Sequence, residues 1–334
     1  MRVLKKLKGV LTIIAICLLL VRVNHSPSPV TIIDNGKVLA QTQHDPIEIT
    51  SDADFVSLGF SGSGTPSEPY IIEDLAIDSL TGFPCISVEG NISSNYVIRS
   101  CEFSGSTSRY YSVVANACLY LNAGSVTIES CSFTNCSIGI GIDEIDAVMI
   151  YDNSFQILAA GTGIYLGGSI GEVYENTITG PIMRPPYSAP SKGIDIMGSN
   201  YSIYDNEISY VDTGIYVYYS LNDIHNNTIH DCLIGASMAV PSSDNRFYYN
   251  YVYANQLNAH DDGTDNIWDD GVSAGNIWGD ATEAPYPIDG IADSVDRYPI
   301  IIEHELDLFL PLTIFAAVVI GLTVLVFIIK RQES

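Results

Sequence analysis

A short phrase recurs along the middle of the chain: an apolar residue, then Asn or Cys three positions later, then another apolar residue two positions after that. The closing apolar residues of seven copies fall at positions 103, 133, 155, 178, 208, 229 and 252. Their spacings are 30, 22, 23, 30, 21 and 23, so the base period is about 22 residues with two insertions of roughly eight. Such a period limits the fold strongly, because each unit must bury its apolar face against neighbouring units.

A second phrase, Gly-Ile-x-apolar, runs in step with the first, beginning for example at Gly139, Gly163, Gly193 and Gly214. Each period therefore holds at least two short segments in which apolar and polar residues alternate, which is the pattern of strands. Short strands repeated every 22 or so residues predict an all-β parallel β-helix of seven to eight coils, stacked about 4.8 Å apart. A β-propeller is a poorer match because its blades repeat at about 40 residues, and sandwiches lack a fixed repeating Asn.

The repeated Asn is predicted to form a ladder inside the solenoid. An amide turned inward at a corner needs hydrogen-bond partners, and stacked amides supply them to one another. The predicted ladder contains Asn153, Asn176, Asn206, Asn227 and Asn250. Cys101 and Cys131 occupy the same offset in the two preceding coils. We interpret these positions as structural.

The cysteines are expected to lie in columns as well. Cys101 stacks on Cys131, and Cys85 on Cys118, at a spacing that permits a disulfide. Unpaired small side chains in a ladder are an equally good interpretation. No pair has the C-x-x-C spacing of a zinc site.

One outward-facing column is a candidate ligand site. Two residues before each ladder Asn stand Tyr151, Tyr174, Tyr204, His225 and Tyr248. Beside them run the acids Asp152, Glu175 and Asp205. Rings in a row with nearby carboxylates can contact sugars, and acids one coil apart approach the separation used by retaining glycosidases. Aromatic columns also stabilise sheets without any ligand, and the sequence favours this structural interpretation over glycan contact and, more strongly, over a catalytic pair.

Two end segments carry a family resemblance. "GSGTPSEPYIIEDLAI" (62–77) and "NIWDDGVSAGNIWGD" with "APYPIDGIADSVDRYPI" (266–300) resemble the ends of NosD-like β-helix surface proteins of archaea and bacteria, whose repeats are described as carbohydrate-binding or sugar-hydrolase repeats. The resemblance implies a right-handed helix over about residues 47–300 and no single activity. The copper role of NosD does not transfer, since no His, Cys or Met cluster here has ligand spacing. We expect no metal or cofactor, and we expect Trp268 and Trp278 to cover the last coil.

Both ends of the chain carry membrane signals. Residues 1–23 fit a signal peptide or an N-terminal anchor, and residues 308–329 form an uncharged stretch long enough for one transmembrane helix. Lys330 and Arg331 after it predict a cytoplasmic tail at 330–334 and an ectodomain outside a single-pass membrane protein. The remaining expected segments are a linker (24–46), an N-terminal cap (47–82), the β-helix (83–265), a C-terminal cap (266–300) and a stem (301–307). Possible glycosylation sites are Asn91, Asn135, Asn200 and Asn226.

The charge balance limits the possible partners. The formal net charge is −25, with only 14 Lys and Arg, so nucleic acid is excluded as a partner. A lyase acting on an anionic polysaccharide would need more positive charge than the coils contain. The sequence leaves the enzyme question open and favours a non-catalytic protein that binds glycan or a surface protein, or contributes to the envelope. The alternative is a surface polysaccharide hydrolase, lyase or epimerase.

Overall fold

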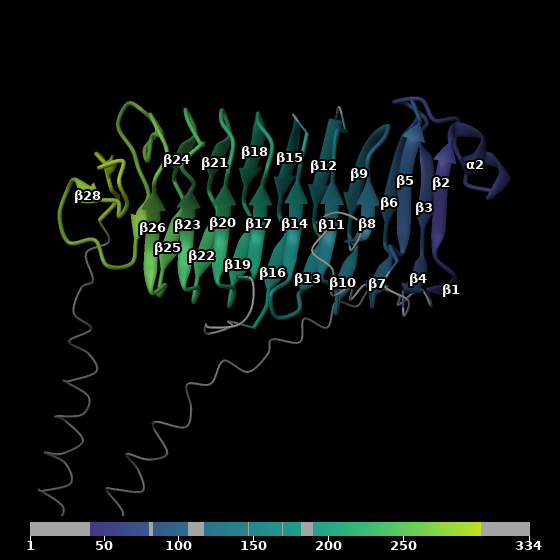
Figure 1. Cartoon of the computed structure of the whole chain (residues 1–334), viewed down its shortest axis with the longest axis horizontal. Coiled ribbons are helices and arrows are strands. Elements are labelled where there is room, and N and C mark those ends of the chain that lie inside the picture. The colour runs from purple at the N-terminus through teal and green to yellow at the C-terminus, as the bar shows by residue number, and fades with distance from the viewer. Residues whose placement is uncertain are drawn as a thin grey trace, which may run out of the picture. The chain divides into compact units, whose positions relative to one another are not determined.

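A computed structural model describes residues 41–79, 83–105, 117–145, 147–168, 170–181 and 190–301. Within these residues three long sheets, here called A, B and C, form a parallel β-helix, as predicted (Figure 1). Each coil contributes one strand to sheet B, then one to sheet C, then one to sheet A. The predicted signal segment, the transmembrane span at 308–329 and both eight-residue insertions fall wholly or largely outside the described residues. No helix within the described residues is long and apolar enough to cross a membrane.

Sheet A contains β1 (Thr42–His44), β4 (Leu75–Asp78), β7 (Glu102–Ser104), β10 (Ser132–Thr134), β13 (Ser154–Gln156), β16 (Thr177–Thr179), β19 (Glu207–Ser209), β22 (Thr228–His230), β25 (Tyr251–Tyr253) and β27 (Ile277–Trp278). Sheet B contains β2 (Ile47–Ser51), β5 (Ile86–Asn91), β8 (Ala117–Leu121), β11 (Ile138–Ile142), β14 (Thr162–Leu166), β17 (Lys192–Ile196), β20 (Thr213–Val217), β23 (Ile234–Met238) and β26 (Leu257–Asp261). Sheet C contains β3 (Tyr70–Glu73), β6 (Asn95–Arg99), β9 (Ser125–Glu129), β12 (Ala147–Tyr151), β15 (Gly171–Tyr174), β18 (Tyr201–Tyr204), β21 (Asp223–His225) and β24 (Arg246–Tyr248). A short helix, α2 (Asp52–Ser57), and an antiparallel pair, β28 (Tyr286–Pro287) with β29 (Val295–Asp296), complete the described elements.

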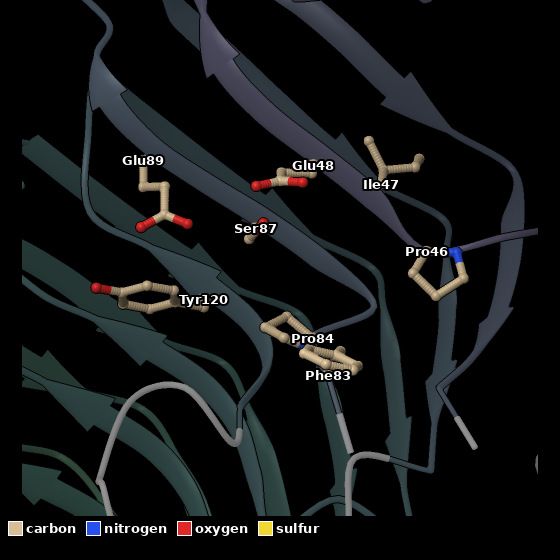
Figure 2. Close-up of a pocket in the computed structure, with 8 residues that line it drawn as sticks. All are labelled: Pro46, Ile47, Glu48, Phe83, Pro84, Ser87, Glu89 and Tyr120. Carbon is tan, nitrogen blue, oxygen red and sulfur yellow. The ribbon is translucent and has the colours of Figure 1, made fainter. Parts of the chain in front are cut away.

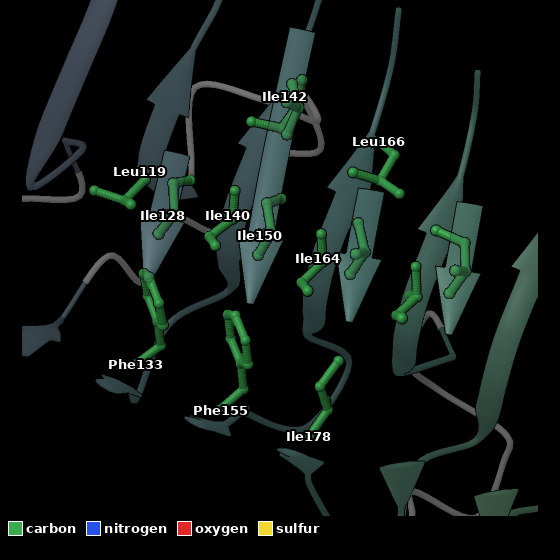
Figure 3. Close-up of a cluster of buried hydrophobic side chains, with 14 of the residues drawn as sticks. Leu119, Ile128, Phe133, Ile140, Ile142, Ile150, Phe155, Ile164, Leu166 and Ile178 are labelled. Atoms are coloured by element: carbon green, nitrogen blue, oxygen red, sulfur yellow. The ribbon is translucent and has the colours of Figure 1, made fainter. Parts of the chain in front are cut away.

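The register of the coils follows the sequence repeat. In sheet A, Phe103 pairs with Phe133, Phe133 with Phe155, and Phe155 with Ile178. The two 30-residue spacings keep this register, so the additional residues do not shift the columns. Each inward side chain therefore packs on the equivalent side chain of the next coil, and the core is a set of continuous apolar columns (Figure 3).

The Gly-Ile phrase marks a second packing constraint in sheet B. At Gly163 an added Cβ would lie 2.6 Å from the carbonyl oxygen of Gly193 and 2.8 Å from the Ile178 side chain. No real Cβ makes contacts this close, so glycine is needed here for space. Gly139, Gly193, Gly214 and Gly235 occupy the equivalent position in neighbouring coils and have similarly close neighbours.

The open ends of the solenoid are covered by aromatic residues. At the N-terminal end, Phe55 of α2 is wholly buried and stacks on Tyr70 with ring centroids 4.7 Å apart. At the C-terminal end, Trp268 and Trp278 are buried against Phe247. The range expected for the N-terminal cap also contains β2, β3 and β4, which already form a coil. Sheets A and B consequently have ten and nine strands, more than the seven to eight coils expected, whereas sheet C has eight.

Neither predicted cysteine pair is bonded. Cys118 forms a disulfide with Cys136, with Cα atoms 6.0 Å apart, whereas Cys85, Cys101 and Cys131 are buried thiols. Stacking alone did not decide the pairing, because side-chain direction matters as well as spacing. The Cys85 thiol donates to the Ser104 carbonyl oxygen at 3.4 Å, and the Cys118 sulfur is bonded to Cys136.

Cys101 and Cys131 instead act like the ladder asparagines that follow them. The Cys131 thiol donates to the carbonyl oxygens of Glu129 at 3.3 Å and Ile98 at 3.7 Å. Asn153, one coil later, donates from its amide to the equivalent carbonyls of Tyr151 and Ile128. The unpaired alternative considered for these two cysteines is the one that the structure shows.

Candidate functional site

A single file of buried amides fixes the corner between sheets C and A. Each amide nitrogen donates to the side-chain oxygen of the next asparagine, at 2.9–3.0 Å from Asn153 through to Asn250. The same oxygen also accepts the backbone N–H of the preceding asparagine. Beyond Asn250 the file continues to Asn276 and ends on the carboxylate of Asp296. The corner is therefore rigid, and it sets the direction of the side chains on either side.

The residue before each of these asparagines adopts a left-handed backbone conformation. Asp152, Glu175 and Asp205 have φ values of 54°, 53° and 54°. Asp and Asn tolerate this region better than most residues, which accounts for most of the polar residues that precede the ladder. The three acids are exposed, and Asp152 accepts a hydrogen bond from Ser130 at 2.7 Å. The four possible glycosylation sites are exposed too, unlike the ladder asparagines.

The predicted aromatic column forms one continuous stack on the outward face of sheet C. Tyr151, Tyr174 and Tyr204 stack with centroids 4.9 Å apart and planes within 5° of parallel. His225 and Tyr248 extend the stack at 5.2 Å spacings. Because each ring face is covered by the next ring, the stack presents ring edges and hydroxyl groups to solvent. A sugar ring cannot lie on these faces, so any glycan contact here would be made by hydrogen bonds.

The hydroxyl groups of this stack donate to acids that the sequence did not single out. The Tyr204 hydroxyl donates to Glu172 at 3.0 Å, and the Tyr151 hydroxyl donates to Glu129. Burial and the Glu172 carboxylate raise the pKa of Tyr204 to about 12, so its hydroxyl stays protonated. Glu172 lies two residues before Tyr174, on the same outward face of β15. An acid two residues before the stacked ring was the available signal in the sequence, and among the coils of the ring stack only Asp223, before His225, repeats it.

The C-terminal end of the column adds a charged pair. Asp223 and Arg246 are register partners on β21 and β24, two residues before the stacked rings of His225 and Tyr248. The Arg246 guanidinium lies 5.0 Å from the centroid of the Tyr248 ring and donates to the Asp270 carbonyl at 2.7 Å. One Asp223 oxygen, Oδ1, is buried without a hydrogen-bond partner. Glu172, Asp223 and Arg246 therefore form a polar margin along the ring stack.

A second amide ladder, also missed from the sequence, supports the corner between sheets B and C. Asn222 donates to Asn245 at 2.9 Å, and Asn245 donates to Asn266 at 2.9 Å. Each of these residues stands two positions before an inward apolar or aromatic side chain. The sequence signal for this ladder is an Asn at that offset, but only three coils carry it.

A shallow pocket of about 540 Å³ lies at the N-terminal end of sheet B (Figure 2). Glu48, Ser87, Glu89 and Tyr120 line it from outward positions of three neighbouring strands. Phe83 and Pro84 lie beside Ser87 and Tyr120 in the close-up. The pocket combines carboxylates with an aromatic ring and has no cationic lining residue.

Comparisons with known proteins match the chain to one family model and to solved structures of low sequence identity. The family model described as "Periplasmic copper-binding protein (NosD)" matches residues 88–283. A mutant of the periplasmic alginate epimerase AlgG is 15% identical, with a TM-score of 0.36, over 69% of this chain and 62% of its own. The Dettilon tailspike protein is 18% identical, with a TM-score of 0.35, over 68% of this chain and 47% of its own. No curated protein matches the chain significantly.

Proposed function

Since more than half of its length matches that model, the chain belongs to the NosD family, and we propose that it is an extracellular β-helix protein that binds an extended glycan without cleaving it. The proposed surface is the outward face of sheet C, here called the tyrosine strip: Tyr151, Tyr174, Tyr204, His225 and Tyr248, with the flanking Glu172, Asp223 and Arg246.

The observation that carries this proposal is the regular spacing of hydrogen-bonding groups. Ring centroids repeat at 4.9–5.2 Å along the strip. An extended β-1,4-linked polysaccharide advances by about the same length per sugar, so each coil can meet an equivalent hydroxyl group. The strip is held by the amide ladder beneath it, and a preorganised surface loses little entropy on binding.

Charge narrows the class of glycan. The formal net charge of −25 and the acids along the strip repel uronic acids and sulfated sugars. Carboxylates accept hydrogen bonds from neutral hydroxyl groups well. The proposed ligand is therefore a neutral polysaccharide lying along the solenoid axis.

The copper in the family description has no matching site among the described residues. Copper prefers His, Cys and Met ligands, and the described ranges contain no group of three or more His, Cys, Asp and Glu able to hold a metal ion. His225 lies within the ring stack, and His230 is hydrogen-bonded to Asp231 at 2.8 Å. The thiols of Cys101 and Cys131 donate to carbonyl oxygens.

We also propose that residues 308–329 anchor the protein in the membrane, with the coils outside and residues 330–334 in the cytoplasm. The support is the uncharged length of this segment and the Lys330-Arg331 pair after it. Protease added to intact cells should release fragments of the coils and spare a C-terminal epitope tag. Degradation of the tag with the coils protected would show the opposite orientation.

The glycan proposal is tested with full-length protein and immobilised hexasaccharides. We expect binding to neutral chains such as cellohexaose, mannohexaose or chitohexaose, and weaker binding to hexaguluronate. The Glu172→Gln variant should bind about tenfold more weakly, because it loses a charged acceptor. Glu102→Gln, an exposed acid on sheet A, is the matched control and should bind normally. Absence of binding to every sugar would refute the proposal, and release of reducing ends would show an enzyme instead.

A further inference from the structure

A buried carboxylate oxygen without a partner lies on the outward face of sheet B. On β17, Asp195 stands between Ile194 and Ile196, which are wholly buried in the core, so alternation turns its side chain outward. Asp195 is nevertheless only 7% exposed, and its Oδ1 has no hydrogen-bond partner. A buried acceptor without a donor destabilises a folded protein, so its presence needs a reason.

The surroundings of Asp195 combine two rings with one cation. Tyr165 and Tyr216 are its register partners in the coils before and after it, and both are half-buried. The Lys192 ammonium group donates to Asp195 Oδ2 at 2.8 Å and lies 3.9 Å from the centroid of the Tyr216 ring. Burial raises the pKa of Asp195, and Lys192 acts in the opposite direction. Lys192 thus satisfies Oδ2, and Oδ1 stays buried without a donor.

An ion pair alone does not account for this arrangement. Pairing with Lys192 uses Oδ2, yet Oδ1 is also held away from water. Asp212, a nearby carboxylate with 5% exposure, shows the structural alternative, since it accepts from both the backbone N–H and the hydroxyl of Ser191, at 2.7 and 3.1 Å.

We propose that the half-buried rings of Tyr165 and Tyr216 turn aside to admit a neutral sugar between them, so that Asp195 Oδ1, fixed by Lys192, accepts a hydrogen bond from one of its hydroxyl groups. This second site rests on the glycan binding proposed above and is separate from the tyrosine strip on sheet C. Aromatic rings beside a fixed carboxylate suit sugars, which have apolar faces and polar edges. The same outward column runs through Gly141, Tyr120 and Ser87 to Glu48, so it connects the site with the pocket of Figure 2.

The test compares matched carboxylate variants of the full-length protein. In Asp195→Asn, Lys192 should hold the amide oxygen, so that the NH₂ group takes the place of the free acceptor. We expect affinity for the best-bound neutral hexasaccharide to fall about tenfold or more, with no loss of thermal stability. Asp212→Asn should lose stability and keep its affinity. Tyr165→Ser should also bind more weakly, and it serves as the second variant if Asp195→Asn fails to fold.

The outcomes separate the two proposals. If the wild-type chain binds neutral sugars and Asp195→Asn and Tyr165→Ser bind equally well, the second site is refuted and the glycan function stands. If Asp195→Asn loses stability as Asp212→Asn does and keeps its affinity, Asp195 is structural. If the wild-type chain binds no sugar, both proposals fail together.

Discussion

Replacing one amide in the middle of the ladder should destabilise the whole solenoid, and Asn206→Ala is the clearest case. The Asn206 amide nitrogen donates to the carbonyl oxygens of Val173 at 2.8 Å and Tyr204 at 2.9 Å, and to Asn227 at 2.9 Å. Its oxygen accepts the backbone N–H and the amide of Asn176, at 3.1 and 2.9 Å. Alanine removes all five of these hydrogen bonds.

The size of the loss in free energy of unfolding depends on which buried groups of the Asn206→Ala variant are left without a hydrogen-bond partner. The backbone N–H of Asn176 loses its acceptor, the Asn206 side-chain oxygen, and water cannot replace it because Asn176 is 1% exposed. A buried donor left in this way costs about 1–3 kcal/mol. The two carbonyl oxygens lose one donor each, at about 1 kcal/mol each. We therefore expect the free energy of unfolding to fall by about 3–5 kcal/mol, a large share of the usual 5–15 kcal/mol of a folded protein.

Urea unfolding of full-length protein, followed by far-ultraviolet circular dichroism, measures this loss. Hydrogen exchange at the Asn176 amide measures it locally, and exchange should become much faster in the variant. Thr177→Ala removes an exposed outward side chain of the same coil and should change stability by less than about 0.5 kcal/mol. Equal stability of Asn206→Ala and Thr177→Ala would refute the reasoning.

Gly163→Ala should lower the free energy of unfolding by about 1–3 kcal/mol, because its Cβ would lie 2.6 Å from the Gly193 carbonyl oxygen; an unchanged urea midpoint would contradict this. Cys131→Asn should raise the urea midpoint, since an amide at this position extends the ladder by one coil; a lower midpoint would show that the thiol fits better. Burial acts to raise the pKa of Asp269, but hydrogen bonds from Arg297 outweigh it and hold that pKa below its ordinary value. Because the unfolded carboxyl has the higher pKa, this contribution to stability is present at neutral pH and is lost as pH falls below about 4. Arg297→Gln should make the loss of thermal stability between about pH 7 and pH 3 shallower, and an unchanged slope would rule out the ion pair as its cause.

The register and the ring stack follow from the sequence because each coil repeats the same offsets. Once Phe133 lies over Phe155, the positions of Asn153, Asn176 and the tyrosines two residues before them are determined. Every coil thus repeats the same information about the fold, and the prediction does not depend on identifying any one strand by itself.

A feature that occurs in only one coil leaves no repeated offset in the sequence and could not be predicted from the period. The bond between Cys118 and Cys136 depends on the direction of each thiol, which column spacing does not contain. In its column Glu172 has one further acid, Asp223, two coils along, and Asp195 has no acid in either neighbouring coil, so no regular repeat of acids marks them. The burial of Asp195 on an outward face comes from its neighbours on either side, which only coordinates reveal.

The amide ladder has a direction, and that direction governs how such a protein can change in length. Every interior asparagine offers donors to one neighbour and an acceptor to the other, so a duplicated coil could be inserted anywhere within the file without leaving a mismatch. The two ends differ: the file begins where Cys131 donates its backbone N–H to Asn153 and terminates on the acceptor-only carboxylate of Asp296. Genes that descend from one ancestor can therefore gain or lose whole coils while Cys131 and Asp296 still close the two ends of the ladder. The spacing between equivalent side chains on the surface stays the same.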